Sequence, residues 1–264
     1  MGIRVSTPEI LPALKERFPP GWVETSDERV DLLYSVSALR TASGKPRRVG
    51  VLYSGFEGEF RHADFSEICD AFESECHKDV ALNAPGFVFV HAGAVVMKHG
   101  AVLFPGRSLS GKTTLVRACL DAGARLLSDE YAVLDGDGHV HPFPRPLGIR
   151  GSAGYRQTRV PAAQLGAAVA EGPSRVSAIV SCRFEGGRRF RPRPLSHGNA
   201  ILELLRHSVP ARTRPEETLA ALGAVVGGAR AWRGVRGEAK EVVEFLGGVE
   251  ASRSATRAAE DQIR

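Results

Sequence analysis

The chain has 264 residues, 43% of them hydrophobic and 25% charged, which is the composition of an ordinary water-soluble globular protein. No apolar run approaches the ~20 residues of a membrane helix, and the start MGIRVSTPEILPALKERF lacks the apolar core of a signal peptide. We therefore expect no membrane segment and a cytoplasmic location. The four cysteines form no CxxC pair and no Cys/His cluster with metal-ligand spacing, so we also expect no disulfide and no structural zinc.

Residues 1–80 are predicted to form a small N-terminal lobe of mixed α/β structure. RVDLLYSVSAL and RRVGVLYSGF are rich in Val, Leu and Tyr, which is typical of strands. The segment 62–82 then has apolar residues at three- and four-residue spacing, which predicts an amphipathic helix that packs against the lobe: Phe65, Ile68, Cys69, Phe72 and Cys76.

The main domain is expected to cover residues 81–250 and to begin with a β-hairpin. GFVFVHAGAVVMKHGAVLF contains two β-rich runs separated by Lys98, His99 and Gly100, a short turn with a glycine. The second strand leads into a glycine turn at Gly106. A helix is predicted to start near Lys112 and to stop at Gly123, which can adopt the left-handed conformation of a C-cap.

The remaining elements are less sharply marked. A strand is expected over ARLLSDEYAVL, a turn at DGDG, and further strands at HVHPF and VSAIVSCRF. GNAILELLRHS, PEETLAALGAVVGG and EAKEVVEFLGG are predicted helices. Residues 251–264 are polar and rich in small residues, so we expect a flexible tail.

The formal charge of +5 is carried mainly by arginine. No helix-turn-helix, zinc-finger or RRM pattern accompanies the arginines, so nucleic acid is not an expected partner. Two interpretations stay open, a solvated face and the rim of a site for an acidic substrate. Five arginines crowd the segment CRFEGGRRFRPRP: Arg183, Arg188, Arg189, Arg191 and Arg193.

Residues 106–113, GRSLSGKT, match the phosphate-loop pattern G-x-x-x-x-G-K-[ST] at every fixed position. The glycines let successive backbone N–H groups point into one concavity, and the N-terminus of the following helix adds partial positive charge. Lys112 is expected to reach the β- and γ-phosphates of ATP, and the Thr113 hydroxyl to bind Mg²⁺. The predicted nucleotide-binding residues are Gly106, Arg107, Ser108, Leu109, Ser110, Gly111, Lys112, Thr113 and Thr114.

Two adjacent acids, Asp129 and Glu130, follow the helix at the end of the next predicted strand. If that strand neighbours the strand before the loop, as sequential elements usually do, Asp129 lies beside the phosphates. One carboxylate can then take the proton from an attacking hydroxyl while the other helps to hold the metal. On an extended strand the two side chains would point to opposite faces, so both reach one site only if the strand bends there. A solvated pair at the start of a loop is the alternative.

The segment that contains the hairpin, the phosphate loop and the two acids resembles the core of HPr serine kinase/phosphorylase and its smaller bacterial relatives. Its sequence is HAGAVVMKHGAVLFPGRSLSGKTTLVRACLDAGARLLSDEYAVLD. The resemblance covers about residues 86–150 and includes HPFPRPLGIR. It implies an α/β fold with a P-loop kinase core, shared with the nucleotide-dependent phosphoenolpyruvate carboxykinases, and it raises a homo-oligomer as a possible assembly. The family's separate N-terminal domain is not recognisable in residues 1–80, and its long signature after the acids is reduced here to PLGIRGSAG.

The resemblance also implies roles for single residues. Asp129 matches the general base, and Glu130 falls where the family usually has a second Asp. Both acids are candidate metal ligands together with Thr113. His91 matches a histidine near the transferred phosphoryl group, although the residues alone favour a buried core histidine. Arg145, which is flanked by prolines, has a stiff backbone and suits a phosphate or an acidic acceptor group, or is part of a rigid surface loop.

The leading hypothesis is an enzyme that uses ATP and Mg²⁺ to phosphorylate a hydroxyl of a peptide, protein or small molecule. A second hypothesis is a nucleotide-gated ATPase or GTPase module for binding or assembly, without an acceptor site. A third, carboxykinase-like transfer to an enolate, is disfavoured because the chain is short and offers no His/Lys/Asp cluster for a second metal.

Overall fold

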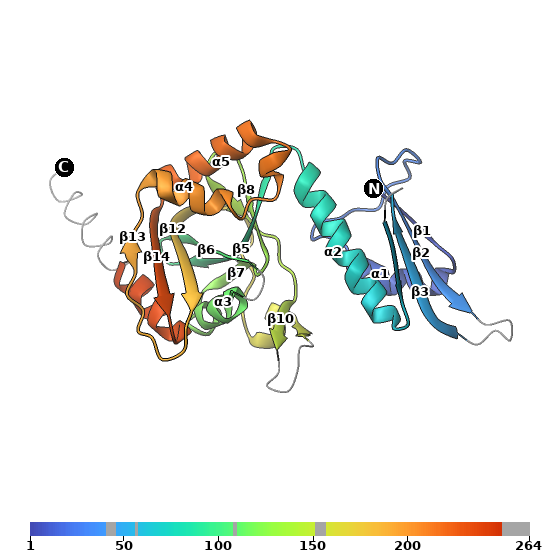
Figure 1. Cartoon of the computed structure of the whole chain (residues 1–264), viewed down its shortest axis with the longest axis horizontal. Coiled ribbons are helices and arrows are strands. Elements are labelled where there is room, and N and C mark those ends of the chain that lie inside the picture. The colour runs from blue at the N-terminus through green and yellow to red at the C-terminus, as the bar shows by residue number, and fades with distance from the viewer. Residues whose placement is uncertain (41–45, 56–57, 108–109, 151–156, 250–264) are drawn as a thin grey trace. The chain divides into compact units, whose positions relative to one another are not determined.

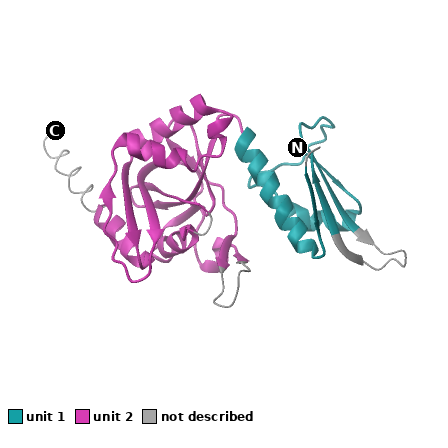
Figure 2. Cartoon of the chain, in the orientation of Figure 1, with its two compact units in different colours: residues 1–83 teal, residues 84–264 magenta. Residues whose placement is uncertain are grey.

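The computed structural model describes residues 1–40, 46–55, 58–107, 110–150 and 157–249. Ser108, Leu109, residues 151–156 of the PLGIRGSAG region and the expected tail at 251–264 lie outside this description. The chain divides into two compact units, Met1–Asn83 and Ala84–Arg264 (Figure 2).

The first unit is a four-stranded sheet with two α-helices and a short 3₁₀ helix. β1 (Gly2–Val5) runs parallel to β2 (Leu33–Arg40), whereas β3 (Pro46–Ser54) and β4 (Gly58–His62) continue the sheet in antiparallel order. The short helices η1 (Pro8–Ile10) and α1 (Leu11–Lys15) precede β2, and α2 (Phe65–Asn83) is the predicted amphipathic helix. Ile68 and Phe72 on its apolar side are buried against Leu14 of α1, Tyr34 of β2 and Leu52 of β3.

An eight-stranded mixed sheet forms the centre of the second unit (Figure 1). β5 (Val88–Met97) and β6 (Gly100–Pro105) are the expected hairpin, with Met97 opposite Gly100. β6 is parallel to β12 (Ser174–Phe184), which is parallel to β14 (Arg230–Arg236). On the far side of β5 lie β7 (Arg125–Ser128), β8 (Tyr131–Leu134) and β9 (His139–His141). β9 also pairs with the start of β12, so five strands form a closed ring: β12, β6, β5, β8 and β9.

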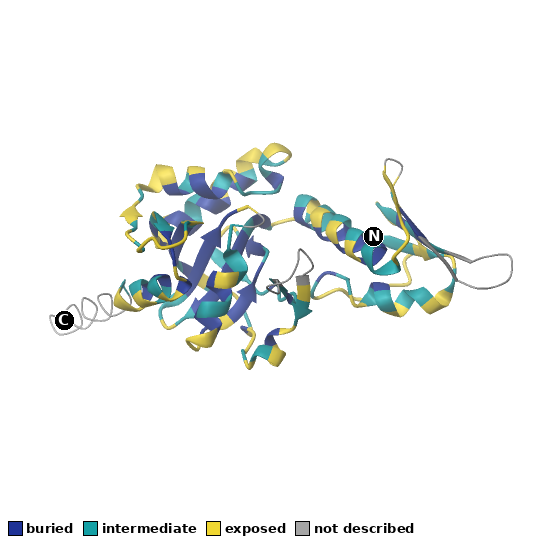
Figure 3. Ribbon diagram, turned by 60° about the horizontal axis from the view of Figure 1, so that its bottom comes forward, coloured by how far each residue is buried: buried dark blue, intermediate teal, exposed yellow. Residues whose placement is uncertain are grey.

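Helices cover both faces of this sheet. α4 (His197–Leu205) and α5 (Pro215–Gly228) pack on one face, where Leu204, Leu222 and Val225 are buried against β5 and β6. α3 (Lys112–Asp121) and the helical residues 239–249 cover the other face through Val116 and Val242. The buried residues, dark blue in Figure 3, accordingly concentrate along the strands. The result is a mixed α/β unit with a helix layer on each side of its sheet.

Smaller elements complete the second unit. β10 (Leu147–Arg150) pairs with β11 (Gln157–Val160) in a separate two-stranded sheet, and β13 (Arg193–Pro194) adds an edge to β14. η2 (Ala162–Leu165) and η3 (Pro210–Arg212) are short 3₁₀ turns. The expected strands and helices are present, except that the single strand expected over ARLLSDEYAVL is divided into β7 and β8 by a bend at Asp129 and Glu130. Gly123 has the expected left-handed φ of 91°. Six strands were not expected from the sequence: β1, β4, β10, β11, β13 and β14.

Within the described ranges, no helix combines the length and the apolar character needed to cross a membrane. All four cysteines are free thiols; Cys69, Cys76 and Cys119 are buried and Cys182 is half-buried.

Candidate functional site

The phosphate-loop sequence lies where β6 ends and α3 begins. Gly106 donates its N–H to the carbonyl oxygen of His91 at 3.1 Å, which holds the start of the loop against β5. Gly111 has φ 88°, a conformation that side chains rarely adopt, and a Cβ there would lie 2.4 Å from Arg236 Nη2. Both the backbone and the crowding therefore require glycine at position 111. Ser110, two residues before α3, is half-buried, and Thr114 is exposed on the first turn of α3.

Lys112 folds back over the loop. Its Nζ donates to the carbonyl oxygens of Gly106 at 3.0 Å and Arg107 at 2.9 Å. Burial lowers the pKa of Lys112, and the negative charges of Glu130 and Asp129 offset part of that effect. The ammonium group is thus held inside the loop, with both acids close enough to influence it.

The strand of Asp129 is not a neighbour of the loop strand, contrary to our expectation. β7 and β8 pair with β5, so β5 lies between them and β6. β5, the first strand of the hairpin, therefore separates the strand of Asp129 from the strand that leads into the loop. Asp129 nevertheless reaches the loop because α3 packs closely across β5, where a Cβ on Gly93 would lie 2.6 Å from Val116 Cγ2.

Asp129 is the most deeply placed acid of the site, with 8% of its surface exposed. Its Oδ2 accepts a hydrogen bond of 2.8 Å from the Thr113 hydroxyl. Its Oδ1 is buried and has no hydrogen-bond partner within the described part of the chain. Burial raises the pKa of Asp129 to about 6; Glu130 adds to the rise, and Thr113, Lys112 and the backbone N–H of Gly148 oppose it. At neutral pH the carboxylate is ionised, but it is far more basic than an exposed aspartate.

Glu130 takes a different direction from Asp129. The chain bends at these two residues, between β7 and β8, as a shared site requires. Glu130 Oε2 lies 2.5 Å from Nη1 of Arg145, whose side chain is 15% exposed. Both acids were candidate metal ligands; in the structure Asp129 contacts Thr113, and Glu130 pairs with the arginine.

His91 lies on β5 opposite Tyr131, with the two ring centroids 4.7 Å apart. Burial lowers the pKa of His91, with Glu130 raising it and Lys112 lowering it. The imidazole is therefore neutral at pH 7 and lies close to both charged groups. The structure thus brings together His91, Lys112, Thr113, Asp129, Glu130 and Arg145.

Replacing Arg145 tests whether its planar fork matters. Arg145→Lys is expected to reduce turnover almost as much as Arg145→Ala, each about tenfold or more, because a point charge cannot reproduce guanidinium geometry and charged hydrogen bonds contribute about 1.5–3 kcal/mol. Steady-state kinetics measure the effect. Arg117→Lys, at an exposed ion pair with Asp121, is the matched control and should change nothing. Wild-type turnover in Arg145→Lys would make Arg145 a structural residue only.

Arg236 is a site residue that the sequence did not indicate. This arginine is 2% exposed, and its Nη2 donates to the carbonyl oxygen of Gly111 at 3.1 Å. Its guanidinium lies 5.3 Å from the ring centroid of Phe184, and its Nη1 donates to Gly237 O. Arg236 therefore braces the loop from β14.

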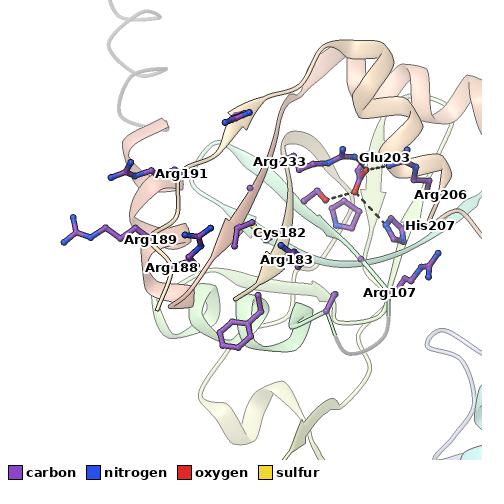
Figure 4. Close-up of a pocket in the computed structure, with 18 of the residues that line it drawn as sticks. Arg107, Cys182, Arg183, Arg188, Arg189, Arg191, Glu203, Arg206, His207 and Arg233 are labelled. Carbon is purple, nitrogen blue, oxygen red and sulfur yellow. Dashed lines mark hydrogen bonds and ion pairs between the residues drawn. The ribbon is translucent and has the colours of Figure 1, made fainter. Parts of the chain in front are cut away.

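Beside the loop is a cavity of about 1410 Å³. It lies between the loop, the end of β12, the segment 187–193, the end of α4 and β14 (Figure 4). Glu203 is buried in it and bonds to Ser181 Oγ at 2.6 Å, to Arg206 Nη1 at 3.2 Å and to Arg233 Nη2. Burial alone would raise the pKa of Glu203, but the contacts with Ser181, Arg233 and His207 hold it below its ordinary value.

His207 connects this cavity to the loop region. Its Nε2 lies 4.0 Å from Glu203 Oε1, and its carbonyl oxygen accepts from the N–H of His91. Burial lowers the pKa of His207; Glu203 raises it, and the positive charges of Lys112 and Arg107, together with the nearby His91 imidazole, lower it further. The sequence offered no signal for His207, a single histidine after a helix.

No family model and no curated protein matches the sequence. Among solved structures, the chain is similar to the Hpr(Ser) kinase/phosphatase from Coxiella burnetii, at 18% identity over 64% of this chain and 98% of that chain, with a TM-score of 0.35. The relationship is distant at most. Residue roles therefore depend on the geometry of this chain alone.

Proposed function

We propose that this chain is a kinase that uses ATP and Mg²⁺ to phosphorylate a hydroxyl of a peptide, protein or small molecule. The observation that carries the proposal is the 2.8 Å hydrogen bond between Thr113 and Asp129. It joins the phosphate-loop motif to a buried carboxylate from another strand, and this combination is typical of a magnesium-nucleotide site.

The donor set fits Mg²⁺. This ion prefers oxygen ligands and is usually held by one or two carboxylates together with substrate phosphates. The unpartnered, buried Oδ1 of Asp129 is an oxygen in need of a cation or a proton. Thr113, Glu130 and Asp129 would hold the ion; when bound, it would neutralise negative charge on the phosphates.

The loop and α3 would bind the phosphates. Backbone N–H groups and the N-terminus of a ten-residue helix attract anions. Lys112 would exchange the carbonyl oxygens of Gly106 and Arg107 for phosphate oxygens, which are stronger acceptors for an ammonium group.

Asp129 would also act as the general base. A pKa of about 6 makes its carboxylate ionised at neutral pH yet basic enough to accept a proton. The acceptor oxygen would attack the γ-phosphorus, its proton would pass to Asp129 Oδ1, and the bond between the γ-phosphorus and the bridging oxygen would break. ADP is the leaving group, so the products are a phosphate monoester and ADP.

A kinase and a nucleotide-gated switch differ in their need for an acceptor. With γ-labelled ATP and a library of serine and threonine peptides, we expect slow hydrolysis alone and label on a hydroxyl when a suitable peptide is present. Mass spectrometry locates the label, and Lys112→Ala serves as the blank. ATP hydrolysis that is insensitive to every acceptor, without a labelled product, would favour the switch.

A further inference from the structure

The cavity beside the loop is strongly cationic. Eight arginines and one glutamate are among its lining residues. All five arginines of the CRFEGGRRFRPRP segment line it, so that segment surrounds a concave site rather than spreading over a flat face. Figure 4 shows Arg183 between Arg188 on one side and Arg107 and Arg206 on the other.

Internal acids compensate only part of this charge. Buried Glu203 contacts Arg206 and Arg233, and Glu185 contacts Arg183 and Arg188 at 3.2 and 3.0 Å. The other four arginines have no ion-pair partner in the described segments and are exposed: Arg107, Arg189, Arg191 and Arg193. Arginine forks of this kind suit carboxylate and phosphate oxygens.

The cavity also meets the proposed transfer site. Gly106, Arg107 and Ser110 of the loop are part of its wall. His207, another wall residue, is close enough to Lys112 for the ammonium charge to lower its pKa, and its carbonyl oxygen accepts from the N–H of His91. A molecule bound in the cavity therefore extends to the place where the γ-phosphoryl group would lie.

We propose that this cavity binds the phosphoryl acceptor, and that the acceptor carries several carboxylate or phosphate groups around its hydroxyl. The proposal rests on the kinase function above and specifies its substrate class. An acidic peptide segment fits better than nucleic acid, because the arginines line a cavity beside the loop instead of an extended surface, which a nucleic-acid backbone would need.

The test measures the binding of a fluorescein-labelled peptide with one serine among glutamates, at saturating Mg-ADP. Its glutamine counterpart should bind at least tenfold more weakly. Arg191→Gln/Arg193→Gln is expected to weaken binding of the glutamate peptide about tenfold or more, as expected for lost charged hydrogen bonds. Both side chains are exposed, so the fold should persist. The matched control is Arg175→Gln/Arg230→Gln, two exposed arginines outside the cavity, which should bind like wild type.

Further probes separate the alternatives. A phosphoserine peptide tests which acidic group the acceptor carries. If it binds more tightly than the glutamate peptide, with the same dependence on Arg191 and Arg193, the acidic groups of the acceptor are phosphates. Equal binding of the glutamate and glutamine peptides would overturn the proposal. So would a 20-nucleotide single strand that binds more tightly than both peptides, because the cavity would then serve nucleic acid. Calorimetry with Mg-ATP distinguishes a failure of the acceptor assignment from a failure of the proposed kinase function. If wild type binds the nucleotide but no acidic peptide, only the acceptor assignment fails.

Discussion

Asp129→Asn is expected to reduce phosphoryl transfer by ~10²–10⁴-fold, the usual contribution of a positioned general base. The affinity for Mg-ATP should change little in comparison. The amide oxygen of asparagine can still accept the Thr113 hydroxyl, so the geometry at the loop is retained while the basic oxygen is lost. Titration calorimetry measures nucleotide affinity, and mass spectrometry of a phosphorylated acceptor measures transfer.

Glu130→Gln is the matched control for this experiment, because it removes the neighbouring charge. The glutamine amide would keep a neutral contact to Arg145. Because Glu130 is proposed to help hold the ion, the variant should lose metal affinity before it loses turnover. If Asp129→Asn instead loses Mg-ATP binding as strongly as transfer, Asp129 acts only as a metal ligand and the base assignment fails. Unchanged affinity and transfer in both variants would remove the acids from the mechanism.

The same substitution has consequences for pH and stability. Between its ordinary value of 3.8 and about 6, the Asp129 carboxyl keeps a proton in the folded state that the unfolded chain has lost. Stability therefore falls as pH rises through this window, by about 3 kcal/mol in total. Above pH 6, Asp129→Asn should unfold at a higher temperature than wild type. The acid limb of the wild-type activity profile, near pH 6, should be absent from any residual activity of the variant.

Lys112→Ala is expected to lower nucleotide turnover by about 10²–10³-fold or more and to weaken Mg-ATP binding. The Lys112 ammonium lies in the loop, where it donates to the carbonyl oxygens of Gly106 and Arg107. Without it, the phosphates lose a charged donor in a partly buried site, where such contacts are strong. Calorimetry and coupled ATPase assays provide the two quantities.

Lys240→Ala is the control for Lys112→Ala. That side chain is 85% exposed and makes only a surface ion pair with Glu244 at 3.7 Å, so its removal should alter neither quantity. Circular dichroism and thermal unfolding must show that Lys112→Ala is folded. Wild-type affinity and turnover in a folded Lys112→Ala protein would contradict the phosphate-loop assignment.

Local sequence signals predicted the elements around the loop well. Apolar spacing, Gly123 and the Lys98–His99 turn are short-range features, and the structure contains the corresponding helix and hairpin. The order of strands was harder, because the inserted position of β5 depends on long-range pairing. The expected adjacency was wrong even though Asp129 does meet Thr113.

The residues missed by the sequence share one physical cause. β14 reads RAWRGVR, with three arginines and a glycine, and its strand form depends on pairing with β12. Arg236 is buried only because that pairing brings it to Gly111. Glu203 and His207 lie at a helix end with no motif, and their environment is assembled from β12, β14 and β5. No window of neighbouring residues contains this information.

The brace between Arg236 and Gly111 has a consequence for the order of biosynthesis. The two residues are 125 positions apart, and β14 is the last strand of the described chain. A ribosome would therefore complete the loop, α3 and both acids long before it makes the arginine that supports the loop carbonyl. A nascent chain that ends before residue 230 carries the whole motif in its sequence but lacks its brace. Competence of the loop is in this sense a late property of the growing polypeptide.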